Sequence, residues 1–116
     1  MRVLVVEDNE NRIKWFQGKL AEFDIARTAE EGVKFIRENV YNLIFLDHDL
    51  GDRIFVDSED PNTGFQVAKI IAETDNKEAE IIIHTMNPGG AIRIQSLLPK
   101  ATYVPFCFLN IKGKGE

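Results

Sequence analysis

Leu43-Ile44-Phe45-Leu46-Asp47 is the stretch that decides the fold, and Val3-Leu4-Val5-Val6-Glu7-Asp8 repeats its pattern near the start of the chain. Each stretch is a short apolar run that ends abruptly in carboxylates. Continuous apolar runs of this length are typical of strands buried on both faces of a parallel sheet. The pattern therefore predicts two central strands, with Glu7, Asp8 and Asp47 just beyond their carboxyl ends.

Helical and extended segments alternate around these two runs. Further strands are predicted at 25–27, 81–83 and 102–104, and helices at 9–22, 28–39, from residue 63 onward and at 91–98. Such alternation is typical of βαβ units joined by right-handed crossovers. We therefore predict one α/β domain over residues 1–111, in which helices cover both faces of a parallel sheet, and a flexible tail at 112–116.

Composition narrows the classes of function. The chain has 116 residues and a formal charge of -5, which argues against a partner such as duplex nucleic acid. We see no apolar run of membrane-spanning length, and the apolar start is too short for a signal peptide. The single cysteine, Cys107, excludes an internal disulfide and is expected to be buried. These features predict a cytoplasmic protein.

Acidic residues gather where parallel sheets bind ligands, beyond the carboxyl ends of the strands. Glu7, Asp8 and Asp47 repel one another when they are close, and a hard cation such as Mg2+ or Mn2+ neutralises them. We predict these three as metal ligands, with Asp49 as a further contact. The alternative is that each acid caps a helix or faces solvent, and for Asp49 this alternative stays open.

Two histidines, the only ones in the chain, fall at the same predicted edge. His48 follows Asp47, and His84 follows the strand at 81–83. Imidazoles titrate near neutral pH and suit two catalytic roles, the activation of water and the protonation of a leaving oxygen. Each histidine taken alone is more simply a hydrogen-bonded residue of a loop or strand end, so both interpretations stay open. Asp47 is also a candidate nucleophile towards phosphorus.

Three residues after the fourth strand are candidates for phosphate binding. The Thr85 hydroxyl would contact a phosphoryl oxygen, while Asn87 and Gly90 would present an amide and a backbone N–H at a helix start. The alternatives are a strand-terminal threonine and an ordinary Asn-Pro-Gly turn.

At this point the chain resembles response-regulator receiver domains. The resemblance rests on Val5-Val6-Glu7-Asp8, Leu46-Asp47, His84-Thr85 and Val104-Pro105-Phe106. It implies a flavodoxin-like, receiver-like three-layer sandwich, with five parallel strands in the order 2-1-3-4-5. It also implies that Asp47 is the phosphate acceptor of a single-domain response regulator.

The chain departs from that pattern in two places. Val104 stands where receivers carry a lysine that contacts the phosphoryl group. Only ten residues follow Phe106, so the final helix is predicted to be missing or truncated. Phe106, Phe108, Leu109 and Ile111 would patch the uncovered sheet face, or a protein partner or second copy would cover it.

A narrower resemblance covers more of the sequence. Leu46-Asp47-His48-Asp49-Leu50-Gly51, the long acidic loop and His84-Thr85-Met86-Asn87-Pro88 are similar to receiver-like domains proposed to process cyclic phosphates. The resemblance implies a phosphoesterase that acts on a small phosphorylated nucleotide or an RNA terminus. A phosphorylated signalling receiver and a pseudo-receiver without phosphate chemistry remain the alternatives.

Overall fold

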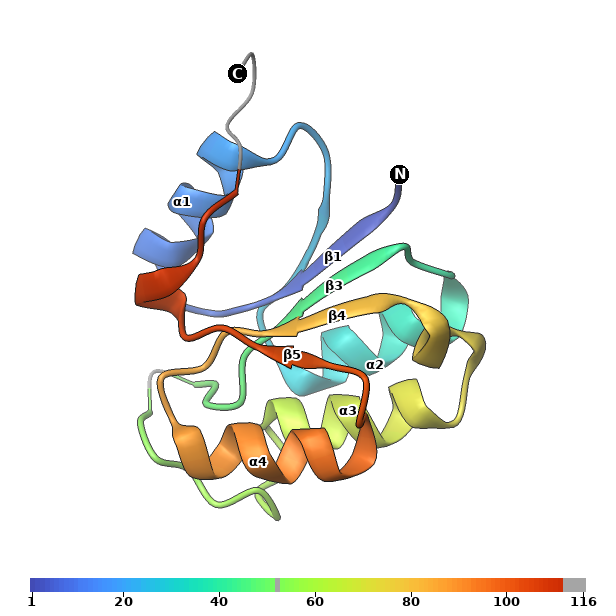
Figure 1. The fold of residues 1–116 in the computed structure, drawn as a ribbon, viewed down its shortest axis with the longest axis vertical. Coiled ribbons are helices and arrows are strands. Elements are labelled where there is room, and N and C mark those ends of the chain that lie inside the picture. The colour runs from blue at the N-terminus through green and yellow to red at the C-terminus, as the bar shows by residue number, and fades with distance from the viewer. Residues whose placement is uncertain (52, 112–116) are drawn as a thin grey trace.

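A five-stranded parallel sheet forms the centre of the molecule. The computed structural model describes residues 1–51 and 53–111, and its strands lie in the order β2-β1-β3-β4-β5 (Figure 1). They are β1 (Val3–Val6), β2 (Asp24–Ala26), β3 (Leu43–Leu46), β4 (Glu80–Ile83) and β5 (Thr102–Tyr103). The predicted flavodoxin-like fold and strand order are confirmed. The tail predicted at 112–116 lies outside the described residues.

Helices cover both faces of this sheet. On one side lies α1 (Glu10–Lys19); on the other lie α2 (Ala29–Glu38), α3 (Gly64–Ala72) and α4 (Pro88–Leu97) (Figure 1). Two short 3-10 turns, η1 (Asp75–Glu78) and η2 (Phe106–Phe108), complete the described elements. Within these residues no helix combines the length and apolar character needed to cross a bilayer.

Two predicted helix boundaries were wrong. α1 ends at Lys19, not at residue 22. α4 begins at Pro88 and not at residue 91, because the Asn87 side chain accepts a hydrogen bond from the Gly90 N–H and caps the helix. An Asn-Pro pair is both a turn signal and a helix start, since proline fits the first helical position.

Alternate residues of each strand face different cores. Leu4 and Val6 belong to the cluster beneath α2, α3 and α4, whereas Val3 and Val5 belong to the cluster beneath α1. Neighbouring side chains of a strand point to opposite faces, so this parity continues to the residues just beyond the strand. It decides which side of the sheet each residue of the site occupies.

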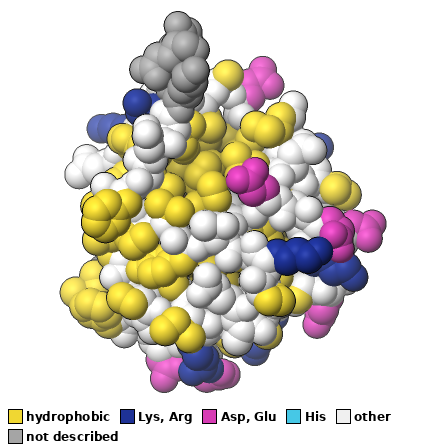
Figure 2. Space-filling view, in the orientation of Figure 1, with side chains coloured by type: hydrophobic (Ala, Val, Ile, Leu, Met, Phe, Trp, Pro, Cys, Tyr) yellow, Lys and Arg dark blue, Asp and Glu magenta, His cyan; other side chains and the backbone are white. Residues whose placement is uncertain are grey.

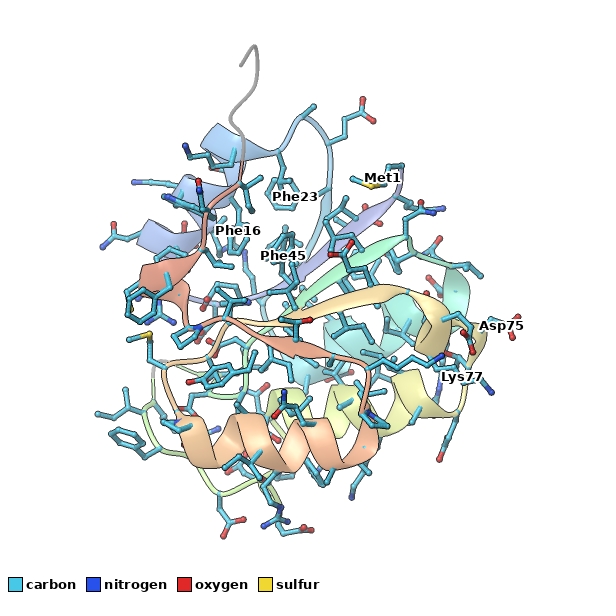
Figure 3. The ribbon with its side chains drawn as sticks, in the orientation of Figure 1. Met1, Phe16, Phe23, Phe45, Asp75 and Lys77 are labelled. Atoms are coloured by element: carbon cyan, nitrogen blue, oxygen red, sulfur yellow. The ribbon has the colours of Figure 1, made fainter. Side chains whose placement is uncertain are left out.

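The face beneath α1 is aromatic. Figure 3 shows Phe16, Phe23 and Phe45 gathered between α1 and the sheet, and the Phe16 and Phe45 ring centroids are 5.0 Å apart. Figure 2 shows hydrophobic side chains spread over this side of the molecule. Phe106 and other residues after β5 pack partly against it.

After β5, the described residues form η2 and no α-helix, as predicted. Of the four residues predicted to patch the open face, Phe106, Leu109 and Ile111 do pack on it, while Phe108 is 73% exposed. Cys107 is exposed, so its predicted burial was wrong. A partner or second copy over this face stays a prediction.

Candidate functional site

Strand parity brings three polar side chains together at the carboxyl edge of the sheet. Pairing continues one residue past the strands, because Asp47 N–H donates to the Val6 carbonyl and His84 N–H to the Leu46 carbonyl, each at 3.1 Å. Glu7, Asp47 and His84 follow Val5, Phe45 and Ile82 at a spacing of two, so all three lie on the α1 side.

These three residues form a tight buried cluster. The His84 Nε2 atom lies 2.9 Å from Glu7 Oε1. Each residue contributes one donor atom to a group whose members lie within 4.8 Å of one another. Glu7 and His84 are fully buried and Asp47 is 3% exposed. Two carboxylates and an imidazole at this spacing fit a divalent cation, which these three residues would hold.

Glu7 and Asp47 have opposite pKa shifts. Burial, followed by the negative charge of Glu7, raises the pKa of Asp47 well above its usual range. Burial also acts to raise the pKa of Glu7, but the hydrogen bond and charge of His84 and the Asn9 N–H hold it below its usual value. Glu7 therefore carries the negative charge that disfavours ionisation of Asp47.

Backbone groups hold both carboxylates in place. Glu7 Oε2 accepts hydrogen bonds from the N–H groups of Asp8 and Asn9 at 3.0 and 3.1 Å, just before α1. Asp47 Oδ1 accepts a hydrogen bond from the His48 N–H at 2.8 Å.

A Cβ atom on Gly64 would overlap the Asp47 carbonyl, so only glycine allows α3 to begin this close to the site.

The sequence analysis missed a cation of this site, Arg12 on α1. Its guanidinium Nη1 lies 3.6 Å from Glu7 Oε1 and 3.8 Å from Asp47 Oδ2. Helical spacing carries a signal for it, since Arg12 lies one turn before Phe16, which faces the sheet beneath α1.

A pocket of about 170 Å³ opens above the cluster. Its lining includes five of the candidate site residues named from the sequence: Glu7, Asp8, Asp47, Asp49 and Thr85. Its other lining residues are Asn9, Arg12, Arg53, Ile54 and Met86. A Thr85 hydrogen bond acts to lower the pKa of Asp47, against the stronger effect of burial.

His48 does not line this pocket. Its parity is that of Leu46, and its ring lies on the α4 side, where a Cβ on Gly90 would come within 2.7 Å of Nδ1. Nδ1 lies 2.7 Å from Asp49 Oδ1 and Nε2 lies 2.8 Å from Ser58 Oγ. The fully buried ring therefore has both nitrogens hydrogen-bonded and anchors the loop that follows β3.

Asn87 and Gly90 are likewise absent from the pocket lining. The Gly90 N–H donates to Asn87 Oδ1, and Asn87 Nδ2 donates to Asp49 Oδ1 at 3.2 Å. Burial acts to raise the pKa of Asp49, but hydrogen bonds from His48, Asn87 and the Phe55 N–H hold it below its usual value. These groups are occupied in building the loop and the start of α4.

His84 has one ring nitrogen without a partner. Its Nδ1 atom is buried and makes no hydrogen bond among the described residues. The ring packs edge-on against Phe16, Phe45 and Phe106, with centroids 5.4, 6.5 and 6.3 Å away. These three aromatic rings orient the imidazole so that Nε2 points towards Glu7.

The solved structures that match this chain include receiver domains. The Thermotoga maritima response regulator TrrA, determined with Mg2+ and beryllium fluoride, is 25% identical over 92% of this chain and 89% of its own, with a TM-score of 0.64. A signal receiver domain of a Pseudomonas fluorescens HD domain-containing protein is 14% identical, with coverages of 93% and 83% and a TM-score of 0.72.

The chain spans less of another match. It covers 65% of a fusion that carries the trimeric coiled coil of yeast Spc42, with 25% identity, 90% of this chain aligned and a TM-score of 0.67. No curated protein matches the chain significantly.

A family model gives the decisive match. The model of the cyclic-phosphate processing receiver domain aligns with residues 2–100, which include β1 to β4 and every lining residue of the pocket. The chain belongs to the cyclic-phosphate processing receiver domain family.

Proposed function

We propose that this domain binds a divalent metal, Mg2+ or Mn2+, and hydrolyses a cyclic phosphodiester at the end of a nucleotide or RNA. The observation that carries the proposal is the buried Glu7-Asp47-His84 cluster, of which Glu7 and Asp47 line the pocket beside Thr85. His84 does not line the pocket and lies behind Glu7, to which its Nε2 atom is bound. A pocket of about 170 Å³ is small beside typical ligand sites. It suits a phosphate group and its metal, with the rest of the nucleotide outside.

Glu7, Asp47 and His84 would hold the ion, with Asp8 beside them at the pocket. The ion, when bound, would polarise the phosphoryl oxygens and stabilise the charge that develops on them. Thr85 would orient one phosphoryl oxygen through its hydroxyl. His48, Asn87 and Gly90 would act indirectly, by fixing the loop after β3 and the start of α4.

Ring opening adds one water molecule. A bond forms between the water oxygen and phosphorus, the bond from phosphorus to one ribose oxygen breaks, and one proton passes from water to that ribose oxygen. Asp8 lines the pocket and lies outside the three-donor cluster. We assign it the transfer of this proton.

The test is a panel of cyclic nucleotides and an RNA oligomer ending in a 2′,3′-cyclic phosphate, each incubated with the protein and Mg2+ or Mn2+. Ring-opened products are separated by chromatography. We expect turnover by the wild type and a loss of about 10²-fold or more in Glu7→Gln and Asp8→Asn. Glu22→Gln, an exposed change outside the pocket, is the matched control. Absence of turnover on every substrate contradicts the proposal.

A second function is favoured by one comparison. TrrA was solved with Mg2+ and beryllium fluoride, and Asp47 follows β3 in a receiver fold. The alternative is therefore a signalling receiver in which the Asp47 carboxylate takes a phosphoryl group. Stable labelling of Asp47 by acetyl phosphate, without ring opening, favours this alternative. For either function we propose a cytoplasmic location, where an exposed thiol such as Cys107 stays reduced.

A further inference from the structure

Among the described residues, Arg12 is the arginine that forms ion pairs with both buried carboxylates. Its Nη1 atom lies 3.6 Å from Glu7 and 3.8 Å from Asp47, distances at the long end of ion pairing. Its side chain is 26% exposed, whereas those of Glu7 and Asp47 are 0% and 4% exposed. Arg12 thus lies between the buried cluster and the open pocket, and it lines that pocket.

An aromatic ring fixes the position of this guanidinium. The Arg12 Cζ atom lies 5.0 Å from the centroid of Phe106, in the η2 turn after β5. The Arg12 backbone N–H donates to Asn9 Oδ1, so the residue belongs to the capped first turn of α1. Two segments that are distant in sequence therefore hold one cation at the carboxyl edge of the sheet.

The other pocket arginine is differently engaged. The Arg53 guanidinium donates two hydrogen bonds to Asp60, at 2.8 and 3.2 Å. Val104, which follows β5 at the same edge, is apolar. Among the described residues that line the pocket, Arg12 is the cation that faces the carboxylate cluster.

We propose that Arg12 binds the phosphoryl group of the substrate, and that metal binding transfers its guanidinium from the carboxylates to phosphate. Without a metal, Arg12 pairs with the carboxyl groups of both Glu7 and Asp47. A divalent cation on the same carboxylates replaces that pairing and repels the guanidinium. The planar fork of arginine then meets phosphoryl oxygens, for which it has the matching bidentate geometry.

The exchange has a measurable consequence. Arg12 competes with the metal but assists phosphate, so its removal has opposite effects on the two ligands. Loss of Arg12 tightens Mg2+ binding, because no cation has to be displaced, and weakens phosphate binding. A residue that only supported the fold would weaken both. The proposal rests on the metal and phosphate site proposed above, but it does not depend on hydrolysis.

The experiment uses Trp15, the only tryptophan in the chain, as a reporter. Its ring lies 5.2 Å from that of Phe106, on which Arg12 stacks. Mg2+ is titrated first, and inorganic phosphate is then titrated at saturating Mg2+. Fluorescence follows both titrations, and calorimetry checks the Kd values. The proteins are the wild type, Arg12→Gln, Arg12→Lys and a matched control, Lys14→Gln, which removes one exposed charge from the same helix.

We expect Arg12→Gln to bind Mg2+ about threefold to tenfold more tightly and phosphate about tenfold or more weakly, as for the loss of a charge-assisted contact. Arg12→Lys retains part of the phosphate affinity, and Lys14→Gln matches the wild type in both titrations. Thermal unfolding of each variant checks that the fold is intact.

Three results would overturn the proposal: equal Kd values in the wild type and Arg12→Gln, weaker binding of both ligands by Arg12→Gln, or no phosphate binding by the wild type with Mg2+ present. Failure of the hydrolysis proposal is distinguishable, because ring opening would be absent while the opposed changes in Kd remain.

Discussion

Gly90→Ala tests whether the His48 ring is held against the start of α4. A Cβ at position 90 would lie 2.7 Å from His48 Nδ1 and 2.8 Å from Cδ2, which is closer than real Cβ atoms approach. The ring is unable to withdraw freely, because Asp49 and Ser58 bind its two nitrogens. The neighbouring Gly89 is the matched control, since its Cβ would meet only Asn87 Oδ1, at 3.5 Å.

Two costs follow from that geometry. Overpacking in a well-packed interior costs about 1–3 kcal/mol. Loss of one of the two imidazole hydrogen bonds adds about 1 kcal/mol. We therefore expect Gly90→Ala to lower the free energy of unfolding by about 2–4 kcal/mol. Gly89→Ala should change it by no more than about 1 kcal/mol, in the stabilising direction, because alanine favours the helix.

Urea denaturation of the two variants side by side measures this difference. With a usual dependence on denaturant, Gly90→Ala should unfold at a midpoint roughly 1–2 M lower than Gly89→Ala. If both variants unfold at the same urea concentration, the His48 ring is not confined between the loop and α4. The placement of the His48 ring on the α4 side of the sheet would then be wrong.

Three further predictions concern charge and metal. Without metal, Asp47→Asn should become more stable relative to the wild type as pH rises above about 4. The raised pKa of Asp47 means that the folded state favours its protonated form. The contribution of this carboxyl group to folding stability is therefore complete below its unfolded pKa and is lost as pH rises through its folded pKa. Urea midpoints at a series of pH values check the sign, and parallel curves contradict it. Mg2+ at about 100 times its dissociation constant should add about 2.7 kcal/mol to the free energy of unfolding of the wild type. Glu7→Gln should lose most of that gain. Equal thermal shifts in both proteins would count against Glu7 as a metal ligand. The pKa of Asp60 should be about 2, because the Arg53 hydrogen bond lowers it. In a carbon-13 NMR titration, Arg53→Gln should return this pKa towards about 3.9. An unchanged pKa in the variant would show that Arg53 is not the cause.

Periodicity predicted the strands and their acidic edge, because buried parallel strands read as apolar runs. The strand order followed from the resemblance to receiver domains. The alternation of side chains along those strands explains why the prediction that His48 and His84 act together at one site was incomplete. His84 has the parity of Ile82, which pairs with Phe45 of β3, and it joins Glu7 on the α1 side. His48 has the parity of Leu46 and faces α4. Two histidines at the same edge of a sheet therefore lie on opposite faces.

Other parts of the site depend on packing over long sequence distances. The proximity of Arg12 to Asp47 and Phe106 requires the crossing of α1 over the sheet and the path of the chain after β5. Local patterns carry no record of either. The same holds for Asn87, whose side chain is occupied by Gly90 and by Asp49, a residue 38 positions away. Its residue type suggested Asn87 as a phosphate ligand, but its hydrogen bonds decide whether its side-chain amide is available to bind phosphate.

The reaction that we propose is the opening of a cyclic phosphodiester by water beside the Glu7-Asp47-His84 cluster. Its most direct test is phosphorus-31 NMR of an RNA dinucleotide with a 2′,3′-cyclic phosphate, incubated with the protein and Mg2+ in water enriched in oxygen-18. We expect a monoester signal to grow with the wild-type protein and to carry one heavy oxygen. With Glu7→Gln it should not grow. If the signal of the cyclic phosphate persists unchanged beside the wild-type protein, the proposed hydrolysis is refuted.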